Sequence, residues 1–243
     1  MDNSVLRVEN LSVRRDGQLV VDGVNFELLS ESDTALVGPN GAGKSSLVAA
    51  VLGLLPRQTG EVWVLGHRLG PAGELPHGVR SQIAYLPQSF ALQGRFPLSV
   101  AEFVAFGFDP PGPRLPWRNR SKRRAAVLVA LARTGSSNLG AKLLSELSGG
   151  ELKRVLLAFC VVRPRKLLLL DEPVAGMTDH ETERTAELFL TLKGKHSLMV
   201  VEHDMSFIRT ISDIVTVLCD GSVLAQGTLD QVQADERVIE VYL

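Results

Sequence analysis

The N-terminal part of the chain contains two stretches in which apolar and polar positions alternate. They span Val5–Val13 and Val20–Leu29, and in the second stretch Val24, Phe26 and Leu28 alternate with polar neighbours. A period of two is typical of strands in an antiparallel sheet that has one face in water. We therefore expect a pair of antiparallel strands at this end of the chain.

Three later stretches are apolar without interruption, at Thr34–Val37, Lys166–Leu170 and Ser197–Val201. Short continuous runs of this kind are typical of parallel strands that are buried on both faces. Other patterns predict two more strands, three helices and a hairpin with a type I′ turn. These elements are Glu61–Leu65, Ser81–Leu86, Ser46–Leu55, Asp179–Lys193, Asp230–Tyr242, and Val215–Leu218 joined to Ser222–Leu224 through Asp220-Gly221.

The middle of the chain has a different pattern. From Phe96 to about Val162 helical periodicity replaces the strand patterns, apart from the proline-rich segment Asp109–Trp117. Alternation of strands and helices on both sides of this region favours a parallel sheet with covering helices. The predicted fold class is α/β, with an antiparallel β subdomain and an inserted helical subdomain near residues 88–160.

Composition excludes several classes of protein. The chain has 243 residues, of which 45% are hydrophobic and 22% charged, with a net charge of −1. These values are ordinary for a globular protein, and they provide no overall basic field for nucleic acid. The longest apolar run, Val155–Val162, is far below the ~20 residues of a membrane span. With no signal-peptide pattern and two distant cysteines, Cys160 and Cys219, we expect a soluble cytoplasmic chain with unpaired thiols.

A glycine-rich segment follows the first buried strand and leads directly into a helix. It matches G-x-x-x-x-G-K-[ST], a pattern whose backbone N–H groups wrap around phosphate oxygens. In such a loop Lys44 reaches the β- and γ-phosphates and Ser45 holds Mg²⁺. An ordinary glycine-rich turn is the alternative, but the flanking strand and helix favour the phosphate loop. The candidate binding residues are Gly38, Pro39, Asn40, Gly41, Ala42, Gly43, Lys44, Ser45 and Ser46.

Two acidic residues, Asp171 and Glu172, end the second apolar run. The carboxyl edge of an open parallel sheet is where such folds bind ligands. Asp171 is therefore a candidate to support Mg²⁺, and Glu172 is a candidate to take a proton from an attacking water. Taken alone, a solvated acidic pair would explain this dipeptide. The phosphate loop earlier in the chain favours the catalytic interpretation.

A second helix start carries glycines, at Ser148-Gly149-Gly150-Glu151. Ser148 is a favourable N-cap, and the exposed N–H groups that follow it can bind an anion. One nucleotide can contact both helix starts if two copies of the chain pack head to tail.

These residues together resemble the ATP-binding-cassette ATPases, and the resemblance covers essentially the whole chain. In that family Gly38–Ser45 corresponds to the Walker A loop, Leu147–Glu151 to the signature motif and Leu168–Glu172 to the Walker B strand. Gln88 of Tyr85-Leu-Pro-Gln88 corresponds to the Q-loop glutamine. His203 of Val201-Glu-His203-Asp corresponds to the switch histidine.

The resemblance implies a P-loop NTPase core, made of residues 1–87 and 161–243, with a helical subdomain at 88–160. It implies ATP and Mg²⁺ as cofactors, with Glu172, His203 and Gln88 as catalytic residues. Ser45, Gln88 and Asp171 would hold Mg²⁺, while Ser148, Gly149 and Gly150 would contact the nucleotide of the partner subunit. The dimer would be a homodimer or a heterodimer with a related ATPase, bound to a separate membrane permease and indirectly served by a substrate-binding protein.

Two positions depart from the family pattern. Arg15 lies near the position where the family usually has an aromatic ring against adenine, and a guanidinium also stacks on a base. Thr178 occupies the position of the usual D-loop aspartate, and Asp179 follows it. Which of these two residues crosses the dimer interface is left open.

The resemblance to particular subtypes is mosaic. Phe96–Gly107 is similar to zinc and manganese importer ATPases, whereas Lys166–Leu243 is similar to urea and branched-chain amino-acid importer ATPases. The segment after the Q-loop contacts the permease in this family, so the metal importer is favoured. Phe90–Pro97, with Phe103 and Phe106, is expected to receive a permease helix, although part of this set must belong to the core. A soluble cassette ATPase without a permease is the alternative from another class.

A basic run lies between residues 114 and 124. Its interpretation is a solvated face, a contact with the permease, or a contact with anionic headgroups. Nucleic acid is not expected as a partner, because the overall charge is near zero and Trp117 is the only aromatic residue in the run. The basic residues are Arg114, Arg118, Arg120, Lys122, Arg123 and Arg124.

Overall fold

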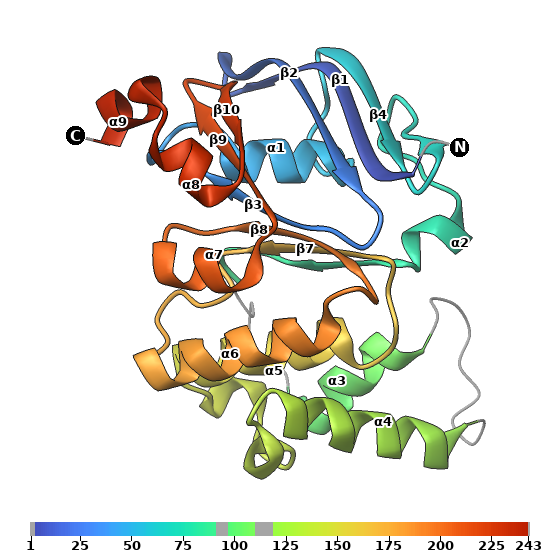
Figure 1. Ribbon diagram of the computed structural model, residues 1–243. Helices are drawn as coiled ribbons and strands as arrows, with labels where there is room; N and C mark the ends of the chain where they lie inside the picture. Colours follow the sequence, from blue (N-terminus) through green and yellow to red (C-terminus); the bar gives the residue numbers. More distant parts are fainter. Residues whose placement is uncertain (1–2, 91–96, 110–118, 243) are drawn as a thin grey trace.

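The computed structural model describes residues 3–90, 97–109 and 119–242, and it contains two sheets with helices packed against them (Figure 1). The strands are β1 Ser4–Arg15, β2 Gln18–Leu29, β3 Asp33–Val37, β4 Thr59–Val64, β5 His67–Arg68, β6 Ile83–Leu86, β7 Leu167–Asp171, β8 Ser197–Val201, β9 Ile214–Cys219 and β10 Ser222–Gly227. The α-helices are α1 Lys44–Val51, α2 His77–Arg80, α3 Val100–Phe108, α4 Arg120–Arg133, α5 Gly149–Val161, α6 Asp179–Leu192, α7 Met205–Ile211, α8 Leu229–Gln233 and α9 Glu236–Tyr242; two 3₁₀ turns cover Ser137–Leu139 and Leu144–Glu146.

The predicted N-terminal strand pair is confirmed. β1 and β2 pair antiparallel in a four-stranded sheet of order β2-β1-β4-β5. Both strands are longer than predicted because they extend to a tight turn at Asp16-Gly17, where both φ angles are positive, at 50° and 80°. A turn of that kind matches the twist of the flanking strands and keeps them paired to its edge.

The second sheet has the order β10-β9-β3-β8-β7-β6. Its strands from β9 to β6 are parallel, and β10 returns antiparallel through Asp220-Gly221, whose positive φ angles confirm the predicted type I′ turn. The register pairs Val201 with Leu36 on one side and with Asp171 on the other. The carboxyl ends of β3, β7 and β8 therefore lie side by side at one edge.

Helices α3, α4 and α5 form a group below the parallel sheet in Figure 1. They share an apolar cluster that includes Val104, Leu131 and Val155, all buried. Arg123 of the predicted basic run makes an ion pair with Asp109 at 3.1 Å, whereas Arg114 and Arg118 lie outside the described residues. Within the described part of the chain, none of the helices has the length and apolar character needed to cross a bilayer.

Two predicted helices differ from the observed ones. The helix expected at Ser46–Leu55 begins at Lys44 and ends at Val51, and Gly53 follows it at a φ of 70°. The single closing helix expected at Asp230–Tyr242 was wrong, because α8 and α9 are separate. The carboxylate of Asp235 accepts a hydrogen bond from the Arg237 N–H at 3.0 Å, and this bond caps a new helix instead of continuing the old one.

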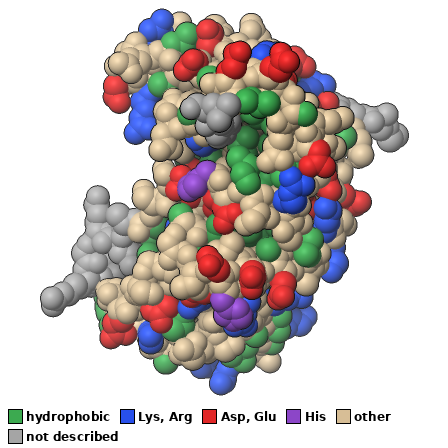
Figure 2. Space-filling model, turned by 60° about the vertical axis from the view of Figure 1, so that its left-hand side comes forward, with side chains coloured by type: hydrophobic (Ala, Val, Ile, Leu, Met, Phe, Trp, Pro, Cys, Tyr) green, Lys and Arg blue, Asp and Glu red, His purple; other side chains and the backbone are tan. Residues whose placement is uncertain are grey.

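The cysteines are unpaired, as the sequence predicts, and the surface charges are mixed in sign. Cys160 and Cys219 are both free thiols; Cys160 is buried, which raises its pKa to about 12, while Cys219 is only partly buried. On the face shown in Figure 2 acidic and basic side chains are interspersed, in keeping with a net charge of −1.

Asp33, the first residue of β3, generates a prediction about stability. It is 4% exposed, and burial, followed by the nearby Asp213 charge, raises its pKa to about 7. Below about pH 4 Asp33 is protonated in both states. Between pH 4 and 7 the unfolded chain releases this proton and the folded chain keeps it, so Asp33 lowers stability as the pH rises.

Asp33→Asn should therefore increase the free energy of unfolding more at pH 8 than at pH 5, with a difference of about 1 kcal/mol or more. Urea unfolding at the two pH values measures this difference. Asp230→Asn, at an exposed position on α8, is the control and should show no such pH dependence. An equal effect of Asp33→Asn at both pH values would contradict the assignment.

Candidate functional site

The glycine-rich loop joins the end of β3 to α1, and two of its glycines allow other strands to come very close. At Gly38, whose φ is 151°, a Cβ would lie 2.0 Å from the Leu218 carbonyl oxygen. At Gly43, whose φ is 94°, a Cβ would lie 2.1 Å from the Val20 carbonyl oxygen. The loop is thus held between β2 and β9, and no larger residue fits either position.

Lys44 begins α1 and folds back over this loop. Its Nζ donates hydrogen bonds to the carbonyl oxygens of Gly38 at 2.7 Å and Pro39 at 2.9 Å. Burial lowers its pKa, while the carboxylates of Glu172 and Asp171 act in the opposite direction. The ammonium group therefore occupies the inside of the loop, where it can exchange carbonyl oxygens for phosphate oxygens. Along the loop Ala42 and Ser46 are buried, Pro39, Gly43 and Ser45 are half-buried, and Asn40 and Gly41 are exposed.

Asp171 ends β7 and lies beside the start of α1. It is 1% exposed and hydrogen-bonded to Ser45, and burial raises its pKa. Its Oδ1 atom is buried without a hydrogen-bond partner. A carboxylate oxygen and a hydroxyl are ligands that Mg²⁺ prefers. An orphaned carboxylate oxygen next to a hydroxyl fits a divalent cation at this place.

Glu172 and Gln88, two of the residues predicted to be catalytic, contact each other. Gln88 Nε2 donates to Glu172 Oε1 at 2.9 Å, although the two residues lie 84 positions apart. Glu172 has a φ of 50°, a left-handed conformation that is uncommon for residues other than glycine. Its N–H donates to the Val201 carbonyl at 2.9 Å. The backbone thus holds Glu172 at the sheet edge in a conformation that costs energy.

Lys153 belongs to this site and was missed from the sequence. Its Nζ donates to the carbonyl oxygens of Gln88 at 2.8 Å and of Glu172 at 3.0 Å. Lys153 lies about one helical turn after Gly150 on α5. That position indicates a role in the site only once its backbone partners, Gln88 and Glu172, are known from the structure.

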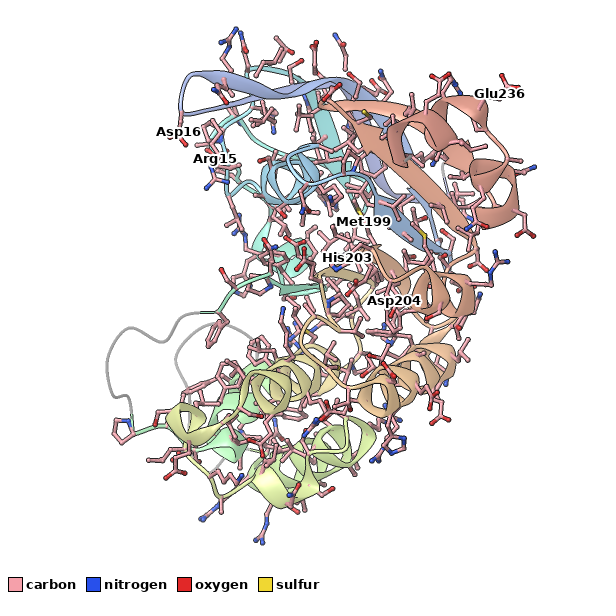
Figure 3. All side chains as sticks on the ribbon, turned by 90° about the vertical axis from the view of Figure 1, so that its left-hand side faces the viewer. Arg15, Asp16, Met199, His203, Asp204 and Glu236 are labelled. Carbon is pink, nitrogen blue, oxygen red and sulfur yellow. The ribbon has the colours of Figure 1, made fainter. Side chains whose placement is uncertain are left out.

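Glu202 was also missed, although it follows an apolar strand as Asp171 does. It is 1% exposed, and its carboxylate accepts hydrogen bonds from the N–H groups of Val174 at 3.1 Å and His203 at 3.0 Å. Burial raises its pKa. The His203 imidazole is 69% exposed, and its Nδ1 lies 3.8 Å from Glu202 (Figure 3). Glu202 therefore holds the loop after β7 next to the histidine backbone.

The second helix start is separate from the glycine-rich loop. Ser148 caps α5: its hydroxyl accepts from the Glu151 N–H at 3.3 Å, and its own N–H donates to the Glu151 carboxylate at 2.9 Å. The predicted N-cap is confirmed. Ser148 and Gly149 are exposed and Gly150 is half-buried. The hydrogen bonds described for Ser148, including that of its own N–H, stay within its own helix start.

The two departures from the family pattern have clear positions. Arg15 is 62% exposed at the outer end of the β1–β2 hairpin, beside Asp16 (Figure 3). The hydroxyl of Thr178 caps α6 by accepting from the Glu181 N–H at 3.4 Å. Asp179, the first residue of α6, is exposed.

The aromatic side chains near the Q-loop are partly core. Phe103 lies between Phe90, at a ring-centroid distance of 5.8 Å, and Phe159, at 5.0 Å. Phe106 is 43% exposed. Phe96 lies outside the described residues. Phe90 and Phe103 are half-buried, so of the described phenylalanines in this predicted set Phe106 is the exposed one.

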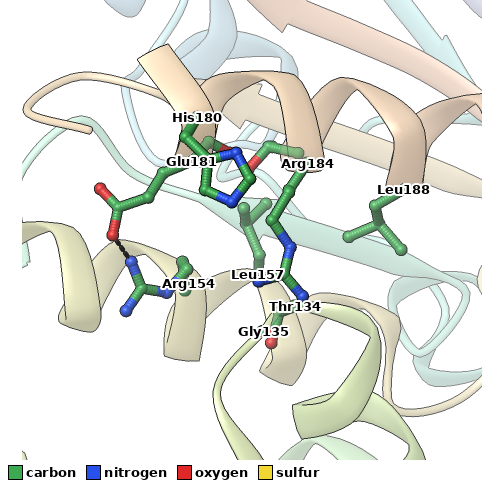
Figure 4. Close-up of a pocket in the computed structure, with 9 residues that line it drawn as sticks. Thr134, Gly135, Arg154, Leu157, His180, Glu181, Arg184 and Leu188 are labelled. Atoms are coloured by element: carbon green, nitrogen blue, oxygen red, sulfur yellow. Dashed lines mark hydrogen bonds and ion pairs between the residues drawn. The ribbon is translucent and has the colours of Figure 1, made fainter. Parts of the chain in front are cut away.

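A small hollow of about 190 Å³ lies where α5 and α6 meet. Arg154 and Glu181, which form an ion pair, both line it, and Arg184 lies on its α6 side (Figure 4). Arg154 directly follows Lys153 on α5. These two successive residues therefore contact different segments: Arg154 contacts α6, and Lys153 contacts the backbone at Gln88 and Glu172.

The sequence matches a known protein family and several characterised transport ATPases. Residues 21–175 match the family model described as ABC transporter, and residues 222–243 match one described as branched-chain amino acid ATP-binding cassette transporter. A zinc import ATP-binding protein of Pseudomonas aeruginosa is 32% identical, over all of this chain and 81% of its own length. A manganese transport system ATP-binding protein of Halalkalibacterium halodurans is 32% identical, over 99% of this chain and 92% of its own length.

Solved structures support the same fold. A nucleotide-free ATP-binding cassette from an ABC transporter superposes with a TM-score of 0.80 at 24% identity, over 99% of both chains. A cassette from Clostridium perfringens, part of the cbiONQ transporter complex, gives a TM-score of 0.76 at 28% identity, over 98% of this chain and 94% of that one. These likenesses agree with the α/β fold class predicted from the sequence.

The orphaned oxygen of Asp171 generates a prediction about the cation. Asp171→Asn removes the charge and keeps the size. The factor by which Mg²⁺ increases nucleotide affinity should therefore be about 10-fold or more smaller in this variant than in the wild type. Titration with a fluorescent ATP analogue, with Mg²⁺ or with EDTA, measures the increment. Because burial already raises the pKa of Asp171, the variant should fold normally. An unchanged Mg²⁺ increment would remove Asp171 from the cation site.

Proposed function

The chain belongs to the ABC transporter family, and from this premise we propose that it is the ATP-hydrolysing subunit of a zinc or manganese importer. ATP binding and ATPase activity follow from the family itself. The metal class is supported by relatives named for zinc import and manganese transport, which match nearly the entire chain. The match to the branched-chain amino-acid model is confined to residues 222–243, so that alternative is not favoured.

The glycine-rich loop binds the phosphates of ATP in this proposal. The N–H groups between Gly38 and Ser46 surround the phosphate oxygens, and the Lys44 ammonium leaves its two carbonyl partners for the β- and γ-phosphates. Asp171, Ser45 and Gln88 would hold Mg²⁺, which supplies charge neutralisation on the phosphates when bound. Support comes from the hydrogen bonds of Lys44 and from the orphaned Asp171 oxygen.

The chemistry is the in-line attack of water on the γ-phosphorus. The bond between the γ-phosphorus and the bridging oxygen breaks, ADP and inorganic phosphate form, and Glu172 accepts the proton of the water. Gln88 donates a hydrogen bond to Glu172 Oε1, and it gives up this bond so that the same oxygen can accept the proton of the water. His203 contacts the γ-phosphate from the end of β8, a role supported by its exposed imidazole.

Two copies complete each site. Ser148, Gly149 and Gly150 of one subunit contact the nucleotide held by the other, a role supported by the exposure of Ser148 and Gly149 at a helix start. The dimer is a homodimer or a heterodimer with a related ATPase. Asp179 is the better candidate for the D-loop contact, since the Thr178 hydroxyl already caps α6. The subunit is held at the cytoplasmic face of the membrane by a separate permease. A substrate-binding protein delivers the solute to that permease.

Replacing the proposed base should separate nucleotide binding from hydrolysis. Glu172→Gln keeps the size but takes no proton, so ATP hydrolysis should fall ~10²-fold or more while Mg-ATP still binds. The variant should then accumulate as an ATP-dependent dimer. Phosphate release and size-exclusion chromatography with Mg-ATP measure the two properties. A variant that hydrolyses ATP at the wild-type rate would refute the assignment of Glu172.

The importer assignment is tested through the permease. Phe106→Glu should release the subunit from a zinc/manganese-type permease, because it places a charge on an exposed apolar surface, and should leave basal ATPase activity unchanged. Leu190→Glu, 46% exposed on α6, is the matched control and should stay bound. Co-purification with this permease and with a branched-chain amino-acid permease pair identifies the solute class. Retention by the amino-acid pair alone would overturn the metal assignment.

A further inference from the structure

The signature helix α5 contacts the catalytic residues of its own subunit through Lys153. The Nζ atom of Lys153 donates to two carbonyl oxygens that belong to distant segments, Gln88 at 2.8 Å and Glu172 at 3.0 Å. One cation therefore joins three elements: α5, the segment after β6 and the end of β7.

The backbone of Glu172 is restrained at both of its polar groups. Its N–H donates to Val201 at 2.9 Å, and its carbonyl accepts from Lys153 at 3.0 Å and from the Ala175 N–H at 3.3 Å. Its φ of 50° is a conformation that persists only when the surroundings enforce it. Without the Lys153 contact, the Glu172 carbonyl would keep the Ala175 bond within its own loop but would lose its link to α5.

Burial and nearby carboxylates act on Lys153 in opposite directions. Burial lowers the pKa of Lys153, and the charges of Glu172, Asp171 and Glu202 partly offset this effect. The side chain is half-buried, so these interactions are only partly screened by water.

We propose that Lys153 is a positioning residue that fixes Gln88 and Glu172 relative to each other and thereby links α5 to the hydrolytic site of its own subunit. The inference rests on the proposed role of Glu172 as the base. The start of α5 carries Ser148–Gly150, which the proposed function places on the nucleotide of the partner subunit. The same helix then acts at both sites of the dimer, at one through its first residues and at the other through Lys153.

Steady-state ATPase kinetics of Lys153→Met test the proposal. This variant removes the donor and the charge while keeping a similar unbranched chain, so kcat should fall about 10-fold or more through misplacement of the base. Affinity for a fluorescent ATP analogue should stay within about twofold, because the hydrogen bonds described for Lys153 go to Gln88 and Glu172 and not to the glycine-rich loop. Lys153→Arg should recover part of kcat.

The matched control is Lys195→Met, which removes a lysine that also donates to a backbone carbonyl, that of Thr191 at 3.0 Å, away from the site. It should leave both values unchanged. Thermal unfolding of all variants identifies loss of fold. If kcat of the well-folded Lys153→Met variant equals that of the wild type, the proposal is wrong.

A double-mutant cycle with Glu172→Gln separates the two possible failures. If Lys153 acts through Glu172, single-turnover hydrolysis by the double variant should equal that of Glu172→Gln, because the base is already absent. Additive losses would overturn the proposed positioning role. If Glu172→Gln alone retains wild-type hydrolysis, the proposed base is wrong; a reduced kcat in Lys153→Met would then be independent of Glu172, and this also overturns the inference.

Discussion

Three carboxylates meet at one edge of the parallel sheet, and the arrangement of the site depends on balancing their charge. Asp171, Glu172 and Glu202 lie at the ends of β7 and β8, which the register places side by side. Like charges in a partly dehydrated place repel one another, and burial raises the pKa of Asp171 and Glu202. Backbone N–H groups satisfy Glu202, while the ammonium groups of Lys44 and Lys153 act on the other two.

The two lysines balance this charge in different ways. Lys44 lies on the glycine-rich loop, and among the described residues its ammonium group bonds only to carbonyl oxygens of that loop, so it can turn toward a new anion without disturbing the sheet. Lys153 lies on another helix and bonds to carbonyls of two separate segments. The first arrangement suits an exchangeable ligand, and the second suits a fixed connection between parts of the protein.

Local chemistry explains which parts were predictable. Three features could be predicted because each depends on residues that are close together in the sequence: the glycine-rich loop, Asp171 at the end of an apolar strand, and the turn at Asp220-Gly221. Lys153 could not be recognised, because its partners lie 65 and 19 residues away and are backbone atoms, which leave no side-chain pattern. The break between α8 and α9 was missed because a single carboxylate, Asp235, competes with a continuous apolar periodicity. The subdomain boundaries at 88 and 160 and the dimer contacts stay predictions.

The close approaches at Gly38 and Gly43 bring the glycine-rich loop into direct contact with both sheets. The Leu218 carbonyl comes from β9 of the parallel sheet, and the Val20 carbonyl comes from β2 of the antiparallel sheet. The turn after β9 continues this contact, since the Gly221 N–H donates to Ala42 and the Asp22 N–H donates to Gly221. A nucleotide that orders the loop thus restrains two sheets at their junction. Its binding should therefore slow backbone amide exchange in strands of both sheets that do not contact the nucleotide.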